Sequence, residues 1–255
     1  MVTVGTCGYS YYDAPEGWKD EYESKLAAFA DEYAAVELQS TFYELPQVST
    51  AERWRREAGE GFTFALKAWQ AVTHPSSSPT WNNHRDAEPE GEKGYFKDAP
   101  AVDDAWNETL ERADALDAEV VVLQTPPSFG ASDEYEAALR SFVERVDRRG
   151  YTVAWEPRGT WKDDPERVEA VCRDLDLVHV VNPLHRDPVD ATDTAYCRMH
   201  GETDDVHDYE YRYEDDELDD LADAVQNLDA DDVYVLFNNT NMFEDAARLE
   251  RRLDE

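Results

Sequence analysis

The stretch that decides the fold lies at residues 120–156 and reads VVVLQTPPSFGASDEYEAALRSFVERVDRRGYTVAWE. It places two short apolar runs, 120–124 and 152–156, on either side of an amphipathic stretch at 134–149. Apolar residues recur in that stretch at helical spacing, and the flanking runs have the length of buried strands. A strand, a helix and a second strand in this order are typical of a βαβ unit, whose two strands lie parallel in one sheet.

The same alternation continues along the rest of the 255-residue chain. It predicts eight strands, at residues 3–7, 35–39, 63–67, 120–124, 152–156, 177–181, 195–200 and 233–238. It predicts helices between most of them, at residues 22–33, 50–58, 102–116, 134–149, 165–174, 214–228 and 242–253. Eight parallel strands with helices outside favour an α/β fold made of a single (β/α)8 TIM-type barrel over residues 1–255. A doubly wound dinucleotide-binding sheet is disfavoured because no GxGxxG motif follows the first strand.

Two connections depart from the regular unit. Residues 74–100 are rich in Pro, Gly, Ser, Asn and Glu, which predicts a long loop after the third strand that could act as a lid. Residues 182–194 are too few, and too interrupted by proline, to form a full helix. The sixth connection is therefore expected to be irregular.

The chain is strongly acidic. It has 59 acidic residues against 24 basic ones, only six of the latter being lysine, and a formal net charge of −35. Self-repulsion of this size destabilises a compact chain in dilute buffer, whereas molar salt screens it within about 3 Å. We therefore expect a halophilic protein. The same charge makes nonspecific binding to nucleic acid or anionic membranes unfavourable, because no basic stripe is present to neutralise phosphates.

The sequence lacks the patterns of a membrane span, a disulfide framework and a metal site. No apolar run reaches the roughly 18 residues that cross a bilayer and no signal peptide is recognisable, so a cytoplasmic location without membrane contact is expected. Cys7, Cys172 and Cys197 form no CxxC pair, which argues against a disulfide framework and a cysteine zinc site. No metal and no cofactor is expected, since HxH and HExxH spacings are also absent. The oligomeric state is left open.

Polar residues gather at the carboxyl ends of the predicted strands, where TIM barrels carry their reactive groups. They are Glu37, Gln39, Lys67, Gln124, Glu156, Arg158, Arg198, His200, Asn238 and Asn239. Residues two apart in a strand share a face, so the pair Glu156 and Arg158 can point into the barrel together, as can Arg198 and His200.

Each of these residues has a structural alternative to a functional role. Lys67 lies in the apolar run FTFALKAW, and because an unpaired buried ammonium costs several kcal/mol we expect an ion pair with Glu37 on the neighbouring strand. Such a pair could be structural or functional. Glu156 and Arg158 could form only a salt bridge between adjacent loops, but a carboxylate that ends a core strand lies at the mouth, which favours a function.

The remaining polar residues are expected to orient a ligand. His200 lies close to Arg198, which disfavours an imidazolium and suits a neutral base or hydrogen-bond donor. Gln124, Asn238 and Asn239 donate and accept without titrating, so they could orient a ligand or, alternatively, cap strand ends and helix starts.

The cations at the mouth predict the class of ligand. Lys67, Arg158 and Arg198 form an electropositive spot inside an acidic shell, and arginine binds phosphate and carboxylate groups through two parallel hydrogen bonds. A small anionic molecule is therefore the expected partner. If Glu37 and Glu156 merely neutralise these cations, no binding site exists.

Short motifs along the chain resemble those of a known family. They are Gly5-Thr6-Cys7-Gly8-Tyr9, Val36-Glu37, Ser40-Thr41-Phe42-Tyr43, Phe64-Ala65-Leu66-Lys67, Thr73-His74, Gln124-Thr125-Pro126-Pro127-Ser128-Phe129, Glu156-Pro157-Arg158, Arg198-Met199-His200-Gly201 and Phe237-Asn238-Asn239. In this order they resemble the YecE-like family (domain of unknown function 72), over nearly the whole chain. The resemblance implies a TIM barrel but no reaction. The family usually has Asn where this chain has Gln39, Phe where it has Pro157, and a shorter segment at 74–100.

Two classes of function follow. In an enzyme, Lys67, Arg158 and Arg198 would hold an anionic substrate for hydrolysis or isomerisation. The general base would be Glu156 or Glu37, and His200 would act as an acid or orienter. Glycoside cleavage by the two glutamates is a variant, and a metal held by Glu37, Glu156 and His200 has less support. The alternative is a non-catalytic protein that binds a metabolite or a nucleic-acid end through the same rim.

Overall fold

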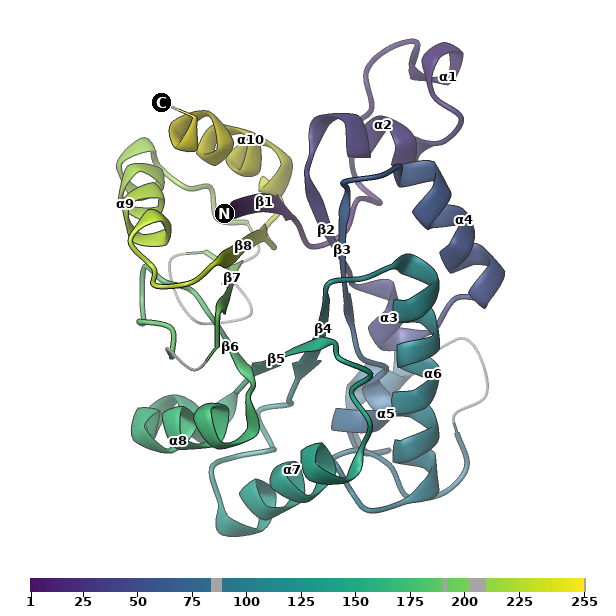
Figure 1. The fold of residues 1–255 in the computed structure, drawn as a ribbon, viewed down its shortest axis with the longest axis vertical. Coiled ribbons are helices and arrows are strands. Elements are labelled where there is room, and N and C mark those ends of the chain that lie inside the picture. Colours follow the sequence, from purple (N-terminus) through teal and green to yellow (C-terminus); the bar gives the residue numbers. More distant parts are fainter. Residues whose placement is uncertain (84–88, 190–191, 202–209, 255) are drawn as a thin grey trace.

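Eight parallel strands close into a barrel in sequence order, with β1 paired to both β2 and β8 (Figure 1). This computed structural model describes residues 1–83, 89–189, 192–201 and 210–254. The strands are β1 (Val2–Thr6), β2 (Ala35–Leu38), β3 (Thr63–Lys67), β4 (Val120–Gln124), β5 (Thr152–Glu156), β6 (Val178–Val181), β7 (Thr194–Met199) and β8 (Asp232–Phe237). The barrel confirms the predicted (β/α)8 fold class, and β3, β4 and β5 have the predicted bounds.

Helices surround the ring of strands (Figure 1). The longer ones are α2 (Lys25–Glu32), α4 (Val48–Ala58), α6 (Pro100–Leu116), α7 (Asp133–Arg145), α8 (Pro165–Leu175), α9 (Asp215–Gln226) and α10 (Met242–Leu253). All seven match a predicted helix. The short ones, none of them predicted, are α1 (Trp18–Glu21), α3 (Ser40–Tyr43), α5 (Gln70–Thr73) and the 3-10 helices η1 (Pro79–Asn83) and η2 (Gly159–Asp163).

Helix ends differ from the predicted ones where local capping decides them. Helix α2 begins at Lys25 instead of residue 22, because the Ser24 side chain accepts the Ala27 N–H at 3.1 Å and caps the first turn. Helix α7 ends at Arg145 instead of residue 149, because Val146 has an extended backbone (φ −84°, ψ 145°) and Arg149 a left-handed one (φ 49°), neither of which continues a helix.

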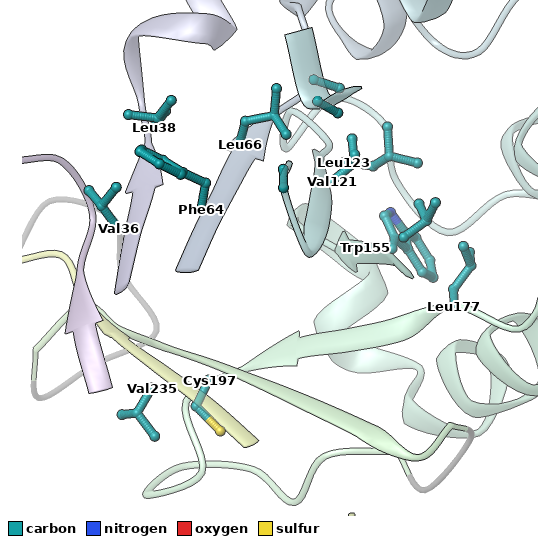
Figure 2. Packing of buried hydrophobic residues seen from close by; sticks show 14 of the residues in the cluster. Val36, Leu38, Phe64, Leu66, Val121, Leu123, Trp155, Leu177, Cys197 and Val235 are labelled. Carbon is teal, nitrogen blue, oxygen red and sulfur yellow. The ribbon is translucent and has the colours of Figure 1, made fainter. Parts of the chain in front are cut away.

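The outer and inner faces of the strands are both buried but differ in side-chain size. The outer face carries large residues that pack under the helices, among them Leu38, Phe64, Leu66 and Trp155 (Figure 2). The inner face carries a separate cluster, which comprises Cys7, Ala35, Ala65, Val120, Val122, Ala154, Val178, Val180, Tyr196, Tyr234 and Leu236. Apolar side chains therefore fill the lower part of the barrel, and polar groups are left to the layer above it.

The irregular connections are only partly described. Residues 84–88 of the predicted 74–100 loop, and residues 190–191 of the sixth connection, lie outside the described residues. Residues 182–189 and 192–193 contain no helix, as predicted for the sixth connection. The helices of the described ranges all fall short of the length and hydropathy that a membrane span requires. Cys7, Cys172 and Cys197 are buried free thiols.

Candidate functional site

A polar layer closes the carboxyl end of the barrel interior. It consists of Glu37, Lys67, Gln124, Glu156 and Arg198, each placed two residues after an inward-facing residue of β2, β3, β4, β5 or β7. Their exposed fractions are 0%, 6%, 8%, 8% and 1%. The alternation of side chains along each strand thus brings together residues that lie up to 161 positions apart (198 − 37).

Arg198 lies between two carboxylates and joins them. Its Nη1 donates to Glu156 Oε2, and its Nε lies 3.1 Å from Glu37 Oε2. Arg158 extends this chain, because its Nε and Nη2 lie 2.7 Å and 2.6 Å from Glu156 Oε1. Two carboxylates and two guanidinium groups therefore alternate as Glu37, Arg198, Glu156 and Arg158, and their charges cancel.

Neutral donors complete the shell around Glu37. The Tyr196 hydroxyl donates to Oε2 at 2.8 Å, and the Gln39 amide donates to Oε1. Burial and the Glu37 charge raise the pKa of Tyr196 well above its usual range, so the hydroxyl remains a donor. Glu37 is thus held by partners on every side, which fits a positioning role better than that of a base.

Lys67 does not form the predicted ion pair with Glu37. Its ammonium donates to Gln124 Oε1 and lies 4.2 Å from the centroid of the Phe42 ring. The prediction was wrong because Glu37 forms its ion pair with Arg198 instead. Burial first, and then the Arg198 charge, lower the pKa of Lys67 to about 7, although Glu37 and Glu156 oppose this shift.

The pKa of Glu156 is set by its arginine neighbours. Burial alone would raise it, but Arg158 and Arg198 hold the pKa well below the usual range of a carboxyl. Glu156 is therefore an ionised carboxylate near neutral pH. Both of its oxygens are engaged by guanidinium groups, so it can accept a proton from a substrate only if one of these contacts opens.

Two histidines, the buried His74 and the half-buried His200, border this layer as neutral rings. His200 Nδ1 lies 3.1 Å from the Asn238 amide nitrogen, so the ring proton belongs on Nε2, which has no hydrogen-bond partner. Burial and Arg198 lower the pKa of His200 to about 3, in agreement with the predicted neutral form. His74, which sequence reasoning did not select as a site residue, lies 4.8 Å from the Phe42 ring, and burial and Lys67 lower its pKa to about 3.

The structure places Asn239 away from this cluster. Its amide donates to the Tyr211 carbonyl and to Asp245 Oδ2, both at 2.7 Å, near the start of α10. Consecutive residues leave a strand on opposite sides, so Asn238 reaches His200 while Asn239 turns toward the helix. Asn239 thus has a structural role near a helix start, whereas Asn238 and Gln124 contact residues of the mouth.

A small cavity of about 50 Å³ opens beside the polar layer, at the ends of β5, β6 and β7. Arg158, Lys162, Arg186 and Arg198 supply four cations to its wall, and Glu156 supplies the single carboxylate. His200 and His179 line it as well. Lys162 and Arg186 were not predicted, since they lie in η2 and in the irregular sixth connection, where no strand periodicity indicates where a side chain points.

A metal held by Glu37, Glu156 and His200 finds no support in this geometry. The guanidinium of Arg198 lies between the two carboxylates, and the His200 nitrogen that could bind a metal already faces Asn238. Across the ranges that the structure covers, no three His, Cys, Asp or Glu side chains come together in a way that could hold a metal ion.

Comparison with known proteins identifies the family. The family described as protein of unknown function DUF72 matches residues 3–255. The chain belongs to this family. The match confirms the resemblance found in the sequence motifs and, like it, carries no reaction.

Individual DUF72 relatives agree with this assignment. UPF0759 protein YunF of Bacillus subtilis (strain 168) is 32% identical over 73 residues, which cover 29% of this chain and 26% of that protein. A DUF72 family protein from Thermotoga maritima MSB8 has a TM-score of 0.71 at 24% identity, with both chains fully covered. Another from Enterococcus faecalis V583 has a TM-score of 0.72 at 18% identity and covers 100% of this chain and 98% of that one. At these identities the solved structures show the shared barrel alone.

Proposed function

We propose that the mouth of this DUF72 barrel binds a small molecule that carries a phosphate or carboxylate group. The observation that supports the proposal is the wall of the cavity, where four cations face one carboxylate in a chain with a net charge of −35. Arginine side chains bind such anions through paired hydrogen bonds, and lysine adds a point charge.

Two of the four cations are engaged by glutamates. Arg158 pairs with Glu156, and Arg198 pairs with Glu156 and with Glu37, which does not line the cavity. Lys162 and Arg186 add two further cations to the same wall. The gathering of four cations around one small cavity is therefore what supports an anionic ligand.

The arrangement favours acid–base chemistry on the bound anion, such as a hydrolysis or an isomerisation. Glu156 is ionised, His200 presents an N–H without a partner, and Lys67 has a pKa near neutrality. A group with a pKa near the working pH can both take up and release a proton during turnover. Lys67 is thus better suited to proton transfer than the glutamates that the sequence favoured.

The test is the thermal stabilisation of the protein by inorganic phosphate and by small carboxylates in 2 M KCl. We expect phosphate to raise the unfolding temperature of the wild type and of Arg53→Met, whose exposed side chain serves as the control. Arg186→Met and Lys162→Met should each lose most of this shift. Equal shifts in all four proteins, or no stabilisation by any anion, would contradict the proposal.

A binding protein without turnover is the second candidate. The engagement of Glu37 and Glu156 by Arg198 favours it, because carboxylates locked in ion pairs serve structure more readily than proton transfer. Glu156→Gln distinguishes the two candidates. If this variant still binds every stabilising compound, and the wild type converts none of them, the protein is a binding module.

A further inference from the structure

Lys67 is a buried amine, and the described residues that contact it, Gln124 and Phe42, are neutral. Its side chain is 6% exposed at the carboxyl end of β3, where it meets the Gln124 amide oxygen and the face of Phe42. Within the described ranges no carboxylate lies within ion-pair distance of its Nζ. Buried lysines normally have an acidic partner, so this setting calls for another explanation.

The surroundings favour the neutral form of this amine. Removal from water disfavours the ammonium, and the guanidinium groups of Arg198 and Arg158 repel it. With a pKa of about 7 instead of 10.5, roughly half of the Lys67 side chains are uncharged at pH 7. A desolvated lysine beside other cations is the form in which this residue acts as a nucleophile toward carbonyl groups.

We propose that Lys67 is a carbonyl-reactive amine, and that the molecule bound at the mouth is a small aldehyde or ketone carrying a phosphate or carboxylate. The inference rests on the proposed function, because the cationic cavity would hold the anionic group. Lys67 does not line that cavity, whereas Glu156 and Arg158 do. The carbonyl end of the ligand would therefore extend past the Glu156–Arg158 pair toward β3.

The chemistry needs no external oxidant or reductant. The lone pair of Nζ attacks the carbonyl carbon, a C–N bond forms, and the π electrons move to oxygen. A proton passes from nitrogen to this oxygen and gives a carbinolamine. Protonation of its hydroxyl and loss of one water then leave a positively charged imine at Lys67. Water adds back in the reverse sequence, the C–N bond breaks, and the carbonyl compound and the free amine are released.

Neighbouring side chains favour both the attack by the Lys67 amine and the charged imine that follows. Gln124 accepts a hydrogen bond from Nζ and so orients the nitrogen, which makes it a positioning residue. Glu37 and Glu156 belong to the same layer, and their charges favour a cation at Lys67, so they would stabilise the imine once formed.

The experiment traps the imine on the intact wild-type protein. Pyridoxal 5′-phosphate, an anionic aldehyde, and propionaldehyde, a neutral one, are each added in 2 M KCl between pH 6 and 9. Borohydride then reduces any imine, and peptide mass spectrometry assigns the adducts among the six lysines. At pH 7 we expect Lys67 to be labelled at least about tenfold faster than the exposed Lys19, and faster by pyridoxal phosphate than by propionaldehyde.

The outcomes separate this inference from the proposed function. If neither aldehyde labels Lys67 ahead of Lys19, while phosphate still stabilises the protein, the amine is inert and only this inference fails. If Lys67 reacts equally fast with both aldehydes and phosphate gives no stabilisation, the anionic class of substrate fails. Lys67→Arg, which keeps the charge, should lose the adduct at this position, whereas the matched Lys19→Arg should keep it.

Discussion

Arg198 is the residue on which the polar layer depends. Burial alone would lower the pKa of its guanidinium, but Glu156 and Glu37 raise it well above the usual range, so the group stays charged at 1% exposure. One buried cation therefore joins two buried carboxylates. A change that removes the cation leaves Glu156 with Arg158 alone and Glu37 with only neutral donors.

Replacement of Arg198 should accordingly be costly. We expect Arg198→Met to lower the free energy of unfolding by about 3–5 kcal/mol, because it leaves uncompensated charge in the barrel interior. Arg212→Met is the control, since the ion pair of Arg212 with Glu244 is more than half exposed and should contribute less than about 1 kcal/mol. Urea denaturation in 2 M KCl measures both, and equal losses would show that the layer is not held by Arg198.

The lowered pKa of Lys67 makes its effect on stability depend on pH. Between about pH 7 and 10.5 the unfolded chain binds a proton at this residue that the folded chain does not, so stability from this group rises with pH in that window. Lys67→Met removes the effect. The stability of this variant minus that of the wild type should fall by about 3 kcal/mol at most between pH 6.5 and 9.5.

The measurement is the urea unfolding free energy at the two pH values. Lys19→Met, which changes an exposed lysine, should show no such trend. A difference between Lys67→Met and wild type that does not change with pH would mean that Lys67 titrates as an ordinary exposed lysine.

At this scale the sequence predicted which residues meet but not how they pair. Strand alternation was enough to bring Glu37, Glu156 and Arg198 to one layer, because parity along a strand fixes the face. Partner choice depends on side-chain reach, and the long fork of Arg198 takes the carboxylate expected for Lys67. Arg186 was missed because only the path of an irregular loop brings it to the cavity.

At the scale of elements, two loops hold the cavity wall in place. η2 follows β5 and packs on the loop after β4, where the Thr160 hydroxyl accepts the Ala131 N–H at 2.9 Å. Gly159 makes the closest approach to that loop, at Pro127. It has a φ of 64°, and a Cβ added to it would lie 2.2 Å from the Pro127 carbonyl oxygen. This glycine sets the direction of the chain between Arg158 and Lys162, both of which line the cavity.

A methyl group at this position should disturb both stability and binding. Gly159→Ala must adopt an unfavourable backbone and also displace Pro127, so we expect a loss clearly above the roughly 1 kcal/mol that a left-handed backbone alone costs. The stabilisation by phosphate should shrink as well. Gly150→Ala is matched, with a φ of 82° and open space around the added Cβ, and should show only the backbone cost and a normal phosphate shift. Identical behaviour of the two variants would refute the role of this contact.

The elements themselves were predicted unevenly. β3, β4 and β5 matched residue for residue because their apolar runs are buried on both faces and end at a polar side chain. α3 and α5 were missed because a single helical turn of four residues leaves no periodicity to detect. Such turns depend on tertiary packing, which brings their buried side chains against the end of the barrel.

At the scale of the whole molecule, negative charge is spread over the surface while the cations are tied up locally. Many arginines bridge neighbouring helices. Arg252 of α10 pairs with Asp215 and Asp219 of α9. Arg167 of α8 pairs with Asp133 and Glu136 of α7. With 59 acidic residues and 24 basic ones, most carboxylates have no cation available to them. We therefore keep adaptation to high salt as a prediction, one that rests on repulsion among these unpaired groups.

Salt should consequently stabilise the protein through screening. Raising KCl from 0.2 to 2 M shortens the screening length from about 7 Å to about 2 Å, so carboxylates on adjacent helix turns cease to repel one another. We expect the urea unfolding free energy of the wild type to rise over this range. In a variant with four exposed acids neutralised (Asp104→Asn, Glu144→Gln, Asp220→Asn, Asp223→Asn), the rise should be smaller and the stability in 0.2 M KCl higher.

A second variant exchanges Asp for Glu and Glu for Asp at the same positions. It keeps the charge and should follow the wild type, because only the number of repelling groups sets the slope. If the neutralised variant instead kept the full dependence on KCl, the stabilisation would come from preferential hydration or ion binding, and the acidic surface would owe nothing to self-repulsion.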